Sequence, residues 1–188
     1  MCVDYKLEEC KEYSSFNIIS KPKTLGDLCC IRLLNIVITF LCKSVFTKEE
    51  LLKKEIVVES LIKNKATEIM YSILKKSETI SYTLLDSALI YFRSVINDMR
   101  LILCGNISLN KLLWKILKIM IRKNSNSNHI VVGLGIIGKL VIKADSLKFS
   151  FIEKGGFKLI YSNFSSNKKE LVSCSLELLH NLLYVRNY

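Results

Sequence analysis

The segment from Phe151 to Leu182 decides the fold, and it reads FIEKGGFKLIYSNFSSNKKELVSCSLELLHNL. Two glycines, Gly155 and Gly156, separate a short apolar run from a second one. Glycine tolerates the left-handed backbone that a sharp corner between two helices requires. Asn167 and Glu170 have the spacing of a capping box, which predicts the start of a third helix. The segment therefore predicts three consecutive helices joined by tight turns.

Two helical patterns recur upstream of this segment with a period in the low forties. The first pattern begins at Ile69, Leu112 and Leu159, at intervals of 43 and 47 residues. The second pattern begins at Ala88, Gly133 and Ser175, at intervals of 45 and 42 residues. Paired helices with a unit of about 40–47 residues are typical of HEAT and armadillo arrays. One such unit cannot bury its apolar face alone, so neighbouring units stack and cover one another.

The quoted segment resembles one armadillo repeat. In that family a short helix ends at a Gly-Gly turn and a second helix packs behind it. A charged loop then leads to a long third helix that ends in Leu-x-Asn-Leu, as residues 179–182 do here. A weaker copy covers Leu101 to Val141, with Cys104 and Gly105 at its corner. The resemblance implies an all-α, right-handed α-solenoid of about three to four armadillo-like repeats over residues 25–188, after an N-terminal tail or irregular cap at residues 1–24.

The first half of the chain also reads as helix after helix. Thr24 and Asp27 resemble a capping box that opens an apolar helix to about Cys42, and Thr47 with Glu50 opens another towards Ile62. A third helix is predicted over residues 66–76 from its apolar spacing. The chain contains one proline and seven glycines, and this scarcity favours long helices over a turn-rich β-sandwich.

A glycine motif offers an alternative reading. Residues 133–138 match GxGxxG, residues 129–132 could form the preceding strand, and Glu153 stands where a dinucleotide fold places its ribose-binding carboxylate. However, that fold needs alternating strands and helices, and only 50 residues follow Gly138. We therefore interpret these glycines as small packing positions on a buried helix, and a dinucleotide-binding enzyme remains the less favoured alternative.

Composition narrows the class of function. The chain has 28 basic and 17 acidic side chains, a net charge of +11, which favours acidic partners such as RNA or an acidic protein segment; solubility is the simpler explanation. Seven cysteines without a CxxC motif and only two histidines indicate reduced thiols and no metal site. No nucleophile–base–acid set is visible: His129 is expected in a loop, and His180 with Glu177 in a surface pair. We therefore expect no enzyme activity and no small-molecule cofactor.

The sequence also predicts the location of the protein. The first residues include Asp4, Glu8 and Glu9 and do not resemble a signal peptide. The longest apolar stretch, Cys29 to Cys42, is shorter than the roughly 20 residues of a membrane-spanning helix. We expect a soluble intracellular protein, cytoplasmic or nuclear, without a membrane span.

A basic stripe marks the first candidate binding surface. Its members, at positions i, i+4, i+7 and i+11 of one predicted helix, are Lys111, Lys115, Lys118 and Arg122. Such a stripe can meet phosphates or an anionic surface, and a solvated outer face is the structural alternative. Trp114 lies in the same helix, where a tryptophan of the core or of a groove is the favoured interpretation and a base-stacking tryptophan the alternative.

The armadillo resemblance implies a second candidate surface on the third helices, which line the peptide-binding groove in that family. Nuclear-import adaptors grip an extended peptide there with a ladder of asparagines and tryptophans. In this chain Asn181 fills the asparagine position once, and Ser94 and Lys139 occupy the equivalent places. The missing ladder argues against nuclear-signal binding, whereas Arg93 and Lys139 would suit an acidic or phosphorylated ligand.

Together these features predict a non-catalytic protein-binding adaptor or subunit of a larger assembly that holds an acidic or extended partner segment. A nucleotide-exchange helper of a heat-shock chaperone is one variety of such a protein within the family. An RNA- or ribosome-associated basic factor is the alternative, distinguished by a steep salt dependence of binding.

Overall fold

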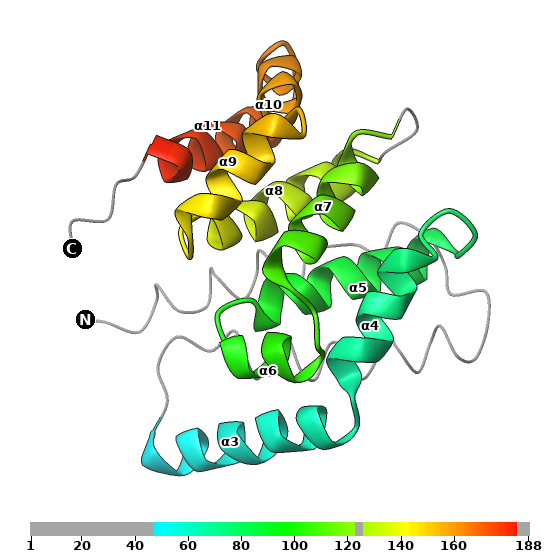
Figure 1. The fold of residues 1–188 in the computed structure, drawn as a ribbon, viewed down its shortest axis with the longest axis vertical. Coiled ribbons are helices and arrows are strands. Elements are labelled where there is room, and N and C mark those ends of the chain that lie inside the picture. Colours follow the sequence, from blue (N-terminus) through cyan, green and yellow to red (C-terminus); the bar gives the residue numbers. More distant parts are fainter. Residues whose placement is uncertain (1–46, 123–125, 184–188) are drawn as a thin grey trace. The chain divides into compact units, whose positions relative to one another are not determined.

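The computed structural model describes residues 47–122 and 126–183, and all regular secondary structure in this part of the chain is helical (Figure 1). The helices, labelled as in Figure 1, are α3 (Lys48–Lys63), α4 (Ala66–Lys75), α5 (Tyr82–Val95), α6 (Met99–Cys104), α7 (Leu109–Met120), α8 (Ser127–Val141), α9 (Asp145–Glu153), α10 (Gly156–Phe164) and α11 (Lys169–Leu183). The predicted all-α class is confirmed for these residues. The predicted tail at residues 1–24 and the helix from Thr24 to Cys42 lie outside them.

The chain divides into two compact units, Met1–Ser94 and Val95–Tyr188. In the first unit, α3 begins directly after Thr47 and α4 spans nearly the predicted range, so both predicted helices are confirmed to within a residue or two. The corner between them is made by Lys65, whose φ of 53° places it in the left-handed region. The short connection brings α3 and α4 into contact as a helical hairpin.

A buried polar contact joins α4 to α5 within the first unit. The hydroxyl oxygens of Thr67 and Tyr91 lie 2.8 Å apart and share a hydrogen bond. The ring of Phe92 packs edge-to-face against the rings of both Tyr91 and Tyr71. Because burial disfavours the phenolate, the pKa of Tyr91 is raised to about 12, although its hydrogen bond with Thr67 acts in the opposite direction.

The second unit consists of two successive helix triplets, α6–α7–α8 and α9–α10–α11. Helix α8 is its centre, since it packs against α7, α9 and α11 (Figure 1). Ten of its residues are buried, among them Gly133, Gly138 and seven aliphatic side chains, so the helix has little polar surface. A helix that is apolar nearly all round is stable only when other helices surround it.

In each triplet, the second and third helices contact each other through residues at equivalent positions of the repeat. A Cβ atom on Gly133 of α8 would overlap the Met120 side chain and lie 3.3 Å from Cγ2 of Ile116, so the missing side chain lets α7 approach closely. In the next triplet, 42 residues later, Ser175 replaces Gly133. Its Oγ accepts a 3.1 Å hydrogen bond from Nδ2 of buried Asn163, which stands 47 residues after Ile116.

The Gly-Gly corner between α9 and α10 has two different requirements. Gly155 has a φ of +84°, so the predicted left-handed residue is confirmed there. Gly156 is instead needed for space, because a Cβ atom at this position would overlap the ring of buried Phe151. The predicted corner at Cys104 and Gly105 ends α6, and the left-handed residue there is Asn106, with a φ of 50°.

The region around the GxGxxG motif corrects one prediction. Residues 129–138 all lie inside α8, so no strand precedes the motif. The prediction that His129 lies in a loop is wrong, because His129 is the third residue of α8 and is buried. The side chain of Asn126 accepts a hydrogen bond from the backbone N–H of Asn128 and caps the helix. Asparagine is as typical of such a cap as of a loop, which explains the error.

The start of α11 corrects another prediction. The capping box of Asn167 and Glu170 does not form, since α11 begins at Lys169 and the first carbonyl to accept a helical bond is that of Lys168, 3.3 Å from the N–H of Val172. The side chain of Ser166 accepts a bond from the Lys168 N–H instead. The serine-rich loop therefore offers a competing acceptor, and the helix starts later than predicted.

Replacing Gly156 by valine should destabilise the second unit by about 1–3 kcal/mol, because the added side chain must displace the buried Phe151 ring. Urea unfolding of the whole chain measures this loss. Ser162→Val is the matched control, since it introduces the same side chain at an exposed position of α10. Equal losses in the two variants would contradict the close approach at Gly156.

Tyr91→Phe should reduce stability at pH 8 by about 1–3 kcal/mol, because the buried Thr67 hydroxyl loses its partner. The raised pKa of Tyr91 stabilises the fold below the unfolded value of 10.0, and this contribution is lost as the pH rises towards and through about 12. The stability difference between the wild type and the variant should therefore shrink between pH 9 and roughly pH 12. A constant difference over that range, measured by urea unfolding, would contradict the burial of this phenol.

Candidate partner-binding surface

Helix α7 presents the predicted basic stripe opposite its buried face. The helix begins at Leu109 because the Ser108 side chain accepts a 3.3 Å hydrogen bond from the N–H of Lys111. The buried side chains are Leu112, Leu113, Ile116, Leu117, Ile119 and Met120. This apolar face directs the stripe outwards, and Lys111 and Lys118 are exposed while Lys115 and Arg122 are half-buried. Three of the four predicted residues thus lie along α7, and Arg122 follows two residues after the end of the helix.

The sequence on either side of α7 contains no acidic residue over a long stretch. Between Asp98 and Asp145 the sequence has eight Lys or Arg residues and no Asp or Glu. The two ends of this stretch carry their own ion pairs, Asp98 with Arg100 at 2.8 Å and Asp145 with Lys148 at 3.0 Å. A surface lined with charge of a single sign attracts ligands of the opposite sign over distances of about a Debye length.

Trp114 lies beside the stripe and does not belong to the core, which was one of the two favoured interpretations. Its side chain is 44% exposed. The ammonium group of Lys154, at the end of α9, lies 5.6 Å from the centre of the indole ring. This is within the range of a cation–π contact, so the ring also brings a fifth cation to the stripe.

A short hydrogen-bond chain holds Lys154 in that position. Its Nζ donates to Oγ of Ser150 at 2.8 Å, and Ser150 donates to the side-chain oxygen of Asn110 at 2.7 Å. The bond between Ser150 and Asn110 holds α9 against the first turn of α7. We call the resulting set Lys111, Trp114, Lys115, Lys118, Arg122 and Lys154 the α7 basic surface. Sequence reasoning missed Lys154, since 32 residues separate it from Arg122 and no local pattern connects them.

The three residues predicted to bind a partner on the third helices lie on three different helices. Lys139 lies on α8 and Asn181 on α11, both half-buried. These two helices approach closely at Gly138, where a Cβ atom would lie 3.1 Å from Nδ2 of Asn181. Arg93 lies on α5 in the first unit, so its grouping with the other two remains a prediction.

Within residues 47–122 and 126–183, no three His, Cys, Asp or Glu side chains gather in a way that could hold a metal ion. Over the same residues, no helix combines the length and the apolar character needed to cross a membrane.

Comparison of the sequence with models of known protein families gives no match, and comparison with curated protein sequences gives none either.

Fluorescence of the single tryptophan tests the environment of Trp114. Iodide should quench it efficiently at low salt, because the surrounding cations concentrate anions near the exposed ring. Lys154→Glu should lower the iodide quenching constant by about twofold or more, with little change in quenching by neutral acrylamide. Lys143→Glu, on the turn after α8, is the control with the same change in net charge. Equal effects of the two substitutions would contradict the placement of Lys154 over the ring.

Proposed function

We propose that this chain is a non-catalytic adaptor built from armadillo-type repeats, which holds an acidic segment of another protein on its α7 basic surface. The proposal includes a right-handed solenoid of about three to four repeats and a cytoplasmic or nuclear location. The observation that carries it is the basic stripe of α7, which lies in a stretch of sequence without a carboxylate and is extended by Lys154 over an exposed indole.

The match between sequence period and burial supports the repeat assignment. Positions paired by the 47-residue offset are buried in both α7 and α10: Leu112 with Leu159, Leu113 with Ile160, and Ile116 with Asn163. Positions paired by the 42-residue offset are buried in both α8 and α11: His129 with Leu171, Gly133 with Ser175, and Ile136 with Leu178. Equal burial at equal register is expected when two units share one packing scheme.

The energetics favour an extended acidic partner over a single anion. One exposed ion pair contributes only about 0.2–1 kcal/mol, so no single lysine here can hold a ligand. Five cations along about three helical turns can act together on a chain with several carboxylates, and their summed field increases the association rate. The aliphatic parts of the lysine side chains and the indole ring add apolar contact beneath the charges.

A specific observation favours RNA as a second candidate partner. Trp114 is exposed between cations, and aromatic side chains in a basic groove stack on the bases of single-stranded RNA. Stacking of this kind is worth about 1–3 kcal/mol for each base. An acidic peptide gains less from the ring, so the contribution of Trp114 to binding separates the two candidates.

Charge reversal on α7 tests the proposed function. Lys111→Glu combined with Lys118→Glu should weaken binding of a fluorescent, glutamate-rich peptide of about twelve residues by roughly tenfold, as two lost attractions become repulsions. Lys63→Glu combined with Lys76→Glu is the matched control, because it changes the net charge equally at exposed positions of the first unit. Fluorescence anisotropy measures both affinities.

Unchanged peptide binding in the α7 variant, or an equal loss in the control, would refute the proposed surface. The same titrations with oligouridylate test the second candidate. If Trp114→Ala weakens RNA binding by about fivefold or more and RNA binds more tightly than the peptide, the RNA-binding function replaces the adaptor function.

A further inference from the structure

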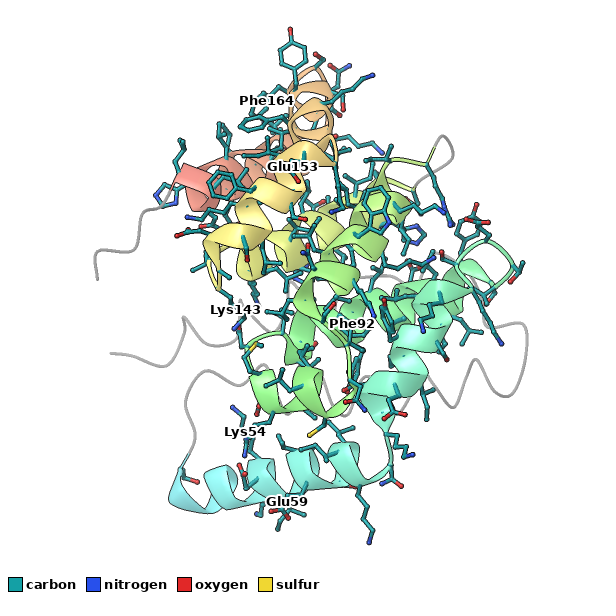
Figure 2. The ribbon with its side chains drawn as sticks, in the orientation of Figure 1. Lys54, Glu59, Phe92, Lys143, Glu153 and Phe164 are labelled. Atoms are coloured by element: carbon teal, nitrogen blue, oxygen red, sulfur yellow. The ribbon has the colours of Figure 1, made fainter. Side chains whose placement is uncertain are left out.

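The last described triplet exposes large apolar side chains, some of them at positions that are buried in the triplet before it. On α10, three aromatic side chains stand at i, i+4 and i+7: Phe157, Tyr161 and Phe164, which are 44%, 76% and 38% exposed. Phe164 is labelled on α10 in Figure 2. By the 47-residue offset, these positions correspond to Asn110, Trp114 and Leu117 of α7.

Helix α9 contacts that side of α7, where Asn110 and Trp114 nevertheless remain exposed. Ser150 bonds to Asn110, Lys154 lies over Trp114, and Leu117 is buried. Among the described residues, no helix follows α11 to cover the corresponding shoulder of α10 in the same way. Phe164 is thus exposed where its counterpart Leu117 is buried, and Tyr161 is more exposed than its counterpart Trp114.

Helix α11 shows the same contrast along a second apolar row. Its members, at i, i+4, i+7 and i+11, are Val172, Leu176, Leu179 and Leu183. Leu176 is 53% and Leu183 is 70% exposed. The equivalent residues of α8, at the 42-residue offset, include Leu134, Ile137 and Val141, and these three are buried. At a further offset of 45, the equivalent residues are Leu85, Leu89 and Phe92 of α5 and Ile96 directly after it, and all are buried.

We propose that the α10–α11 face, formed by these three aromatic and four aliphatic side chains, is a homodimer interface on which a second copy of the chain packs the same face around a two-fold axis. The inference uses the repeat equivalence of the proposed function but not its acidic ligand. Three arguments favour a second copy as the occupant.

The α10–α11 face exposes a large apolar area. With about 200 Å² for a whole aromatic side chain, the three rings alone expose on the order of 300 Å². Leu176 and Leu183 add to this surface. A standard interface buries about 800 Å² on each partner, of which somewhat more than half is apolar. The exposed apolar surface thus approaches what a dimer of ordinary size requires.

The spacing of the apolar row on α11 also suits a symmetric dimer. The row on α11 alternates steps of four and three residues, which is the a/d pattern of a coiled-coil seam two heptads long. Such a seam is complementary to itself when two copies run antiparallel, since Leu176 then packs against Leu179 of the second copy and Val172 against Leu183. Two-fold dimers are the commonest symmetric oligomers, and they need a patch that is complementary to itself.

The charge balance of α10 and α11 also favours a second copy. The chain carries a net charge of +11, so two copies repel each other over most surfaces. Helices α10 and α11 are an exception, because Glu170 and Glu177 nearly balance the lysines that lie on them, Lys158 and Lys169. Two copies can therefore meet on this face without bringing one basic surface against another.

Sedimentation equilibrium of the whole chain tests the proposal. The wild type should show a mass of twice 21.6 kDa at micromolar concentration. Leu183→Glu and Tyr161→Glu, on the two different helices, should each raise the dimer dissociation constant by about tenfold or more, because each places a charge in the apolar interface. Phe149→Glu is the matched control: Phe149 is 66% exposed on α9, outside the face, and its substitution should leave the dimer intact.

Added salt separates this interface from ligand binding. Salt screens the repulsion between the two basic chains, so the dimer should tighten with salt, whereas binding of the acidic peptide should weaken. A wild-type chain that stays monomeric up to about 200 μM overturns the proposal, and so does a dimer that neither variant on the face weakens. Circular dichroism confirms that each variant is folded, and peptide binding by the monomeric variants shows that the α7 surface acts independently.

Discussion

The close approach of the second and third helices of each triplet is the constraint on which the second unit depends. Gly133 permits it between α7 and α8, where Ile116 and Met120 fill the space that a side chain would need. Ser175 permits it between α10 and α11 and returns a hydrogen bond to Asn163. If either residue were large, the helices would separate and their apolar faces would be exposed to water. Because protein interiors are close-packed, such a separation spreads to the neighbouring helices.

This packing also creates the α7 basic surface. Once one face of α7 is buried against α8, its lysines must point outwards together. Packing of α9 on the shoulder of α7 then brings Lys154 to Trp114 through Ser150 and Asn110. The surface is therefore a consequence of how two triplets stack, although most of its members belong to one helix. The same stacking scheme leaves the α10–α11 face open, so one rule of packing accounts for both surfaces.

Much of the local structure could be predicted from the sequence. Periodic apolar residues identified the helices from Thr47 onwards, and two glycines identified the corner before α10. The errors arose where one residue type serves two purposes. Asparagine both caps helices and forms loops, so the position of His129 was predicted wrongly, and a serine competes for the N–H of Lys168, so the start of α11 was placed too early. The local sequence is compatible with both local structures, and the packing of the surrounding helices determines which one forms.

The sequence by itself determined the helical class of the described residues, the spacing of the basic stripe and the absence of carboxylates around it, because these depend only on the order of residues along the chain. Tertiary structure decided which shoulder of each helix is covered. It placed Trp114 in solvent under Lys154 and buried His129, and it left Tyr161 exposed at the position that corresponds to Trp114. The reason is physical: a helix has the same apolar pattern whether or not a neighbour packs on it, and burial depends on that neighbour.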